Sequence, residues 1–76
     1  MKIINVDSEI MSGTPVFNGT RVPLQNLFDY LETGDSIEEF LEDFPSVRRE
    51  QVVGLLEISQ KMILASTELL HEDFVG

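Results

Sequence analysis

The chain has 76 residues, enough for one small domain whose core is too small to be generously stable without a partner. Its fourteen acidic and five basic side chains give a formal charge of −9, which opposes general, charge-driven binding to nucleic acid or anionic lipid, so any contact with nucleic acid is expected to be local. The absence of cysteine excludes disulfides and thiol catalysis, and no apolar run approaches the ~20 residues of a membrane span, so we expect a cytoplasmic protein.

The first 22 residues predict a strand followed by a β-hairpin arm. Residues 2–6 (KIINV) are short and β-branched, which is typical of an opening strand. The Asn18-Gly19 pair favours a two-residue hairpin turn in which Val16 opposes Arg21. This register predicts that Phe17 lies on a buried face and that Val16 and Arg21 lie on the other.

Three helices are predicted after the hairpin. Pro23 suits the first position of a helix that Gly34 ends. Ser36 and Glu39 form a capping-box pattern for a second helix, which stops before Pro45. We therefore expect a mainly α fold with a helix-turn-helix core over residues 23–59 and a helical extension over residues 60–76.

The third helix is predicted to be capped by Ser46. If it runs unbroken to His71, it is about 37 Å long, more than so small a domain requires, and the surplus is expected to pack on another chain. Gly54 costs about 1 kcal/mol relative to Ala in the middle of this helix, and close approach of a neighbouring helix would explain it.

Two segments resemble the domain-of-unknown-function 433 family. Residues 13–23 (GTPVFNGTRVP) match the form G-x-P-x-x-x-G-T-R-[IV]-P, and residues 34–45 (GDSIEEFLEDFP) match G-x-[ST]-x-E-E-[IF]-L-x-x-[FY]-P. The chain departs from the family at Thr14, where a basic residue is frequent, and at Arg48-Arg49, where the family more often has Thr followed by a neutral or acidic residue.

The resemblance implies a small homodimer with a homeodomain-like core. It also implies the antitoxin role in a toxin–antitoxin pair, in which the chain neutralises a PIN-like ribonuclease encoded alongside it, and repression of its own operon. The alternative is a helix-turn-helix repressor without a dedicated toxin.

Two charged groups bear on these alternatives. The start of the third helix offers candidate DNA contacts, namely Ser46, Arg48, Arg49 and Gln51. The second helix would cross the DNA backbone, yet it carries four acids that repel phosphate: Glu38, Glu39, Glu42 and Asp43. Such an acidic surface suits the basic rim of a ribonuclease, or it is simply solvated. The two arginines would alternatively pair with nearby glutamates.

The C-terminal segment and the hairpin are the other candidate interfaces. Apolar residues of the segment can dock in a partner's groove, form a dimer or complete the protein's own core; we select Met62, Ile63, Leu69, Leu70 and Phe74 as toxin contacts. Arg21 is expected to be a structural anchor facing acids of its own or a second subunit. The residues assigned to dimerisation or structure are Phe17, Asn18, Gly19, Arg21 and Val22.

No cofactor, metal or enzymatic activity is expected. Acids in a row along one helix do not converge on a cation as loop ligands do. His71 is the single histidine, and nothing supplies a nucleophile beside a base.

Overall fold

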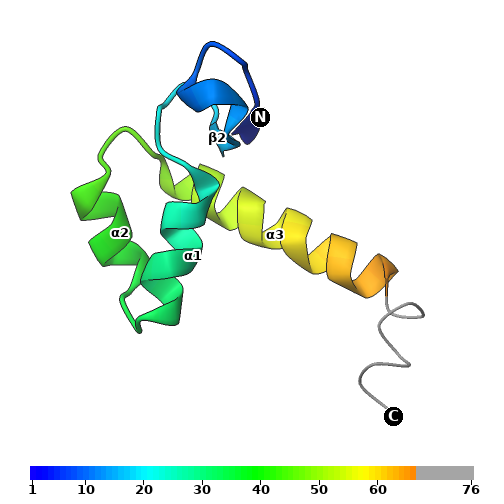
Figure 1. Cartoon of the computed structure of the whole chain (residues 1–76). Coiled ribbons are helices and arrows are strands. Elements are labelled where there is room, and N and C mark those ends of the chain that lie inside the picture. The colour runs from blue at the N-terminus through cyan, green and yellow to red at the C-terminus, as the bar shows by residue number, and fades with distance from the viewer. Residues whose placement is uncertain (67–76) are drawn as a thin grey trace.

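The computed structural model describes residues 1–66, in which a two-stranded antiparallel sheet packs against three helices (Figure 1). This arrangement confirms the predicted, mainly helical fold class. The elements in chain order are β1 (Ile4–Asn5), the short 3-10 helix η1 (Met11–Gly13), β2 (Val16–Phe17), α1 (Leu24–Glu32), α2 (Ile37–Asp43) and α3 (Arg49–Ala65).

The turn at Asn18-Gly19 forms, but the predicted hairpin register is wrong. A type I′ hairpin turn, which Asn-Gly favours, needs a positive φ at both residues. Gly19 has a φ of 80°, but the φ of Asn18 is not positive, so this type of turn does not form. The Thr20 hydroxyl donates to the Phe17 carbonyl at 2.8 Å and accepts from the Val22 amide at 3.0 Å. These bonds lengthen the loop, and Val16 pairs with Pro23 instead of Arg21.

β2 therefore lies between two extended segments. On one side it pairs with β1, with Ile4 opposite Phe17, and on the other side it meets the segment that returns from the turn. Both residues of β2, Val16 and Phe17, are fully buried, which corrects the expectation that Val16 lies on the outer face with Arg21.

The stop signal of the first helix and the start signal of the second are confirmed. Pro23 is the N-cap of α1, one residue before its predicted place. Gly34, with a φ of 86°, ends α1 in a Schellman motif, in which the Asp35 amide donates to the Tyr30 carbonyl at 2.9 Å. The Ser36 hydroxyl accepts from the Glu39 amide at 3.1 Å and so caps α2 as predicted.

The N-cap of α3 lies two residues after the predicted cap, Ser46. Ser46 lies in a turn closed by a bond from the Val47 amide to the Phe44 carbonyl, which directs the Val47 side chain into the core. Arg48 is the N-cap, and its amide donates to the Gln51 side chain at 3.0 Å. The burial of Val47 thus decides where the helix starts.

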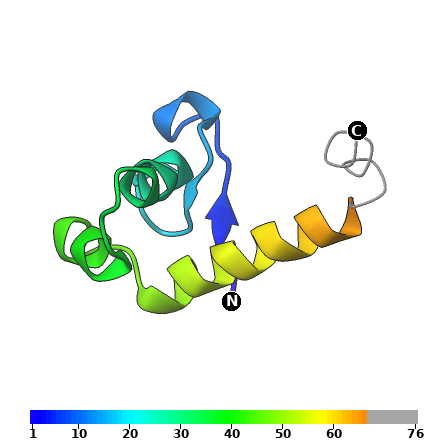
Figure 2. The same ribbon diagram turned by 90° about the horizontal axis from the view of Figure 1, so that it is seen from below.

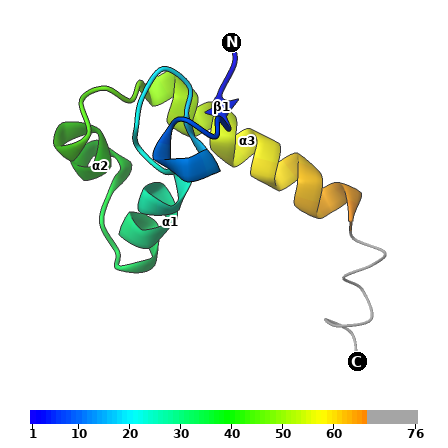
Figure 3. The same ribbon diagram turned by 45° about the horizontal axis from the view of Figure 1, so that its top comes forward.

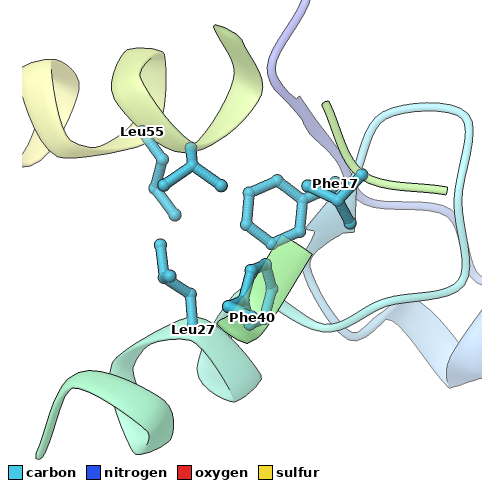
Figure 4. Packing of buried hydrophobic residues seen from close by; sticks show 6 residues of the cluster. Phe17, Leu27, Phe40 and Leu55 are labelled. Carbon is cyan, nitrogen blue, oxygen red and sulfur yellow. The ribbon is translucent and has the colours of Figure 1, made fainter. Parts of the chain in front are cut away.

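The core brings together β2 and all three helices. In Figure 4, Phe17, Leu27, Phe40 and Leu55 converge from β2, α1, α2 and α3. The Phe17 and Phe40 ring centroids lie 5.9 Å apart, and Phe40 also packs edge-on against Tyr30 at 5.4 Å. Such tilted and edge-to-face pairs add to the burial energy of each ring.

Gly54 lies where β1 meets α3. A Cβ atom at Gly54 would stand 2.7 Å from Ile3 Cδ1, so the close neighbour is the start of the chain and not the predicted helix. Figures 2 and 3 show β1 set against the middle of α3. The missing side chain lets the small sheet approach this helix.

The second half of α3 extends beyond the core (Figure 1). The buried residues of this helix are Gln51, Val52 and Leu55, all in its first half. Residues 60–65 are all exposed, so roughly the last two turns of this helix have no core beneath them. The predicted continuation of the helix to His71 lies outside the described residues.

Candidate functional site

The projecting half of α3 exposes large apolar side chains. Met62 is 65% exposed, Ile63 58% and Leu64 63%. Met62 and Ile63 were selected from the sequence, while Leu64 was missed because it falls off the apolar stripe; three consecutive apolar residues on a helix are the signal that could have found it. The other predicted toxin contacts, Leu69, Leu70 and Phe74, lie outside the described residues.

This exposed surface continues the side of α3 that builds the core. Leu55 and Met62 are seven residues apart, and residues at that spacing share one side of a helix. Leu55 is 3% exposed and Met62 is 65% exposed. The apolar stripe thus continues past the point at which the protein's own core ends, and we call Met62 and Ile63 the α3 apolar surface.

The four acids of α2 are all exposed, and three of them have bonds within the chain. Glu38 forms an ion pair with Arg49 at 2.7 Å, and this hydrogen bond lowers the pKa of the Glu38 carboxyl. Glu39 accepts from the Ser36 hydroxyl at 3.3 Å. Asp43 accepts from the Tyr30 hydroxyl at 2.5 Å, which raises the pKa of Tyr30 to about 12.

Glu42 is the member of this set whose carboxylate has no bond within residues 1–66. We call Glu38, Glu39, Glu42 and Asp43 the acidic surface. Within residues 1–66, no three His, Cys, Asp or Glu side chains are grouped to hold a metal ion.

Three of the four predicted DNA contacts, Ser46, Arg48 and Gln51, line one hollow, and Arg49 is not part of its lining. Ser46 and Arg48 are exposed, but Arg49 is held by Glu38, as the alternative interpretation expected. Gln51 is only 5% exposed, and its amide nitrogen donates to the Asn18 carbonyl at 2.9 Å. The structure therefore does not support Gln51 as a base contact, because both ends of its side chain are bonded within the fold.

Three of the five hairpin residues contribute to the fold of the single chain. Phe17 is fully buried in the core, Val22 packs against it, and Asn18 accepts the bond from Gln51. Arg21 is exposed, and in the described part of the chain its guanidinium has no acid within ion-pair distance, so the expected anchor to acids of its own subunit is not observed. A role in dimerisation stays a prediction.

Among residues 1–66, no helix has both the length and the apolar character to cross a membrane.

Comparison with known proteins identifies the family of this chain. The family model described as protein of unknown function (DUF433) matches residues 4–57, from β1 to the middle of α3. The uncharacterized protein y4eO of Sinorhizobium fredii (strain NBRC 101917 / NGR234) is 37% identical over 51 residues, 67% of this chain. The matched region is 23% of that relative's length. No solved structure matches the chain. The chain belongs to the DUF433 family.

Proposed function

We propose that the chain is the antitoxin of a toxin–antitoxin pair and neutralises a PIN-like ribonuclease by direct binding. The observation that carries this proposal is the α3 apolar surface, where Met62 and Ile63 lie mostly in water on a helix that extends past its own core. An amphipathic helix of this kind docks into an apolar groove of a partner protein. The match to the family model ends at residue 57, so Met62 and Ile63 lie outside the matched residues.

The acidic surface supports the choice of partner. A ribonuclease attracts RNA phosphates with basic side chains, and an acidic protein competes for those side chains through complementary charge. Glu39 and Glu42 lie exposed on α2 and are accessible to such basic side chains, and the net charge of −9 would speed the approach to a basic partner. The proposal places this activity in the cytoplasm and includes a homodimer as the neutralising species.

A helix-turn-helix repressor is the second candidate, and Arg48 is the observation in its favour. Arg48 is exposed at the N-cap of α3, where a recognition helix would begin. Three features oppose this mode of binding: the pairing of Arg49, the burial of Gln51 and the acids of α2. Neutralisation is therefore the function that we favour.

Growth rescue tests the proposal. The toxin is the ribonuclease encoded beside this chain, expressed from an inducible promoter together with either the full chain or one truncated after Gln60. We expect the full chain to restore growth and the truncated chain to fail, because the truncation removes the α3 apolar surface. Full rescue by the truncated chain would contradict the proposal.

Point substitutions separate loss of contact from loss of fold. Met62→Gln combined with Ile63→Gln should abolish rescue while leaving the circular dichroism spectrum and the melting temperature unchanged, because both side chains are already exposed. Val53→Gln is the matched control, since Val53 is an exposed apolar residue on the same helix beside the core. It should rescue growth as the wild type does.

A further inference from the structure

Three of the five basic side chains of this acidic protein surround one stretch of surface. Two adjoining hollows share Asn18, Gly19 and Ser46 in their linings. Lys2 and Arg48 line the first hollow, a cavity of about 340 Å³, and Arg21 lines the second. We call the two hollows the basic groove, defined by Lys2, Asn18, Gly19, Arg21, Ser46 and Arg48.

The charge of this groove is not neutralised within the described residues. In residues 1–66, no Asp or Glu lines either hollow, and neither Arg21 nor Arg48 has a carboxylate within ion-pair distance. The Lys2 ammonium donates to a neutral group, the Asn5 side-chain carbonyl, at 3.3 Å. Arg49, directly after Arg48, is by contrast held by Glu38 at 2.7 Å. Positive charge thus gathers where the acids are absent.

The wall between the two hollows is held in place. Gln51 is buried and ties the Asn18 carbonyl to the first turn of α3, with its other end on the Arg48 amide. Gly19, at the tip of the turn, has no atom within 4 Å of the position that a Cβ would occupy, so the tip is open. The basic side chains therefore project from a fixed support around an unobstructed turn.

We propose that the basic groove binds the phosphate backbone of a nucleic acid. Guanidinium and ammonium groups bind phosphate oxygens, and the Ser46 hydroxyl adds a neutral donor. Lys2, Arg21 and Arg48 are all exposed, so the site is an open rim; a small-ligand pocket instead encloses most of its ligand. Separate cations along two adjoining hollows suit successive phosphates of a polymer.

This inference does not depend on toxin neutralisation, and it differs from recognition by a helix-turn-helix. Lys2 and Arg21 come from the N-terminal sheet region, which a helix-turn-helix reading of α2 and α3 leaves out. The contacts are to phosphate and carry no base sequence. Three phosphates neutralised per chain predict a roughly 40-fold loss of affinity between 50 mM and 200 mM salt.

Fluorescence anisotropy with a labelled, mixed-sequence DNA duplex tests the proposal on the full chain. We expect salt-sensitive binding by the wild type at 50 mM salt, and a loss of roughly tenfold for each of Lys2→Gln, Arg21→Gln and Arg48→Gln. Arg49→Gln and Lys61→Gln are the matched controls, because they remove the same charge outside the groove. Both controls should bind within about twofold of the wild type.

Three results would overturn the proposal. The first is no binding by the wild type at 50 mM salt. The second is an equal loss of affinity for Arg48→Gln and Arg49→Gln, which would show that net charge and not the groove determines the binding. The third concerns inorganic phosphate, titrated at constant ionic strength while the amide chemical shifts of the groove are monitored. Saturation with the same affinity as for the duplex would assign the groove to a free anion. The Lys2→Gln and Arg48→Gln variants should still rescue growth, so failure here is distinguishable from failure of neutralisation.

Discussion

The Gln51 side chain joins the start of α3 to the turn at Asn18: its amide nitrogen donates to the Asn18 carbonyl at 2.9 Å, across 33 positions of sequence. The other end of the same side chain accepts from the Arg48 amide at 3.0 Å. One buried amide therefore caps a helix and fixes a turn.

Removal of this side chain should destabilise the fold. Gln51→Ala leaves a partly buried carbonyl and a helix-end amide without their partners, so we expect a loss of about 1–3 kcal/mol in the free energy of unfolding, measured by urea denaturation. Gln60→Ala is the control, because Gln60 is exposed on the same helix and should change stability by less than about 0.5 kcal/mol. Equal effects of the two substitutions would contradict the structural role of Gln51.

The contact between Gly54 and Ile3 predicts that the effect of a substitution at position 54 depends on the residue at position 3. Ala at position 54 gains about 1 kcal/mol in helix propensity, but its Cβ would meet Ile3 Cδ1 at 2.7 Å. We therefore expect Gly54→Ala to be more favourable in an Ile3→Ala background than in the wild type, by about 1 kcal/mol. A double-mutant cycle by urea denaturation measures this coupling, and a coupling of zero would show that the two residues are not in contact.

Local rules in the sequence predict the helices well. The capping box at Ser36 and the glycine stop at Gly34 depend on neighbours within four residues, and both are found where the pattern places them. Phe17, Leu27, Phe40 and Leu55 follow the apolar periodicities and form the core. The mainly helical class follows from these signals.

Longer-range contacts decide the features that the sequence did not predict. The turn register is an exception, because the Thr20 hydroxyl, which competes for the backbone that an Asn-Gly hairpin would use, bonds to neighbours two and three residues away. The start of α3 depends on the burial of Val47, and the role of Gln51 depends on a turn 33 positions away. Such pairings become visible only when distant segments are placed together.

The hydrogen bond between Tyr30 and Asp43 predicts an unusual titration. This bond raises the pKa of Tyr30 to about 12 from an ordinary value of 10.0, because the nearby carboxylate disfavours the phenolate. The associated stability is fully present below pH 10 and is lost as the pH rises toward 12. Tyr30 is the chain's single tyrosine and there is no tryptophan, so phenolate absorbance reports it alone.

Asp43→Asn should lower the midpoint of this titration toward 10, because the substitution removes the negative charge. Asp29→Asn is the control, since Asp29 bonds to Gln25 and not to Tyr30. The midpoint of the Tyr30 titration in this variant should equal that of the wild type. A wild-type midpoint at 10 in the folded protein would contradict the bond.

The ion pair between Glu38 and Arg49 predicts a small effect with a defined pH dependence. The bond to Arg49 lowers the pKa of Glu38 below 4.5. The contribution of this ion pair to the stability of the fold is therefore present above pH 4.5 and is lost as the pH falls through the lower, folded-state pKa. Both groups are exposed, so the effect should vanish in 1 M salt. Thermal unfolding of the wild type and Glu38→Gln should differ at pH 7 in low salt and coincide at pH 2; a difference that persists in high salt would contradict this assignment.

The central claim is that the α3 apolar surface binds a ribonuclease. Calorimetric titration of the purified full chain into the proposed partner, a PIN-like ribonuclease, tests this claim most directly. We expect tight binding by the wild type and by Val53→Gln, and an affinity at least roughly tenfold weaker for the variant carrying Met62→Gln and Ile63→Gln. Unchanged affinity of that double variant, with the ribonuclease still bound, would contradict the account.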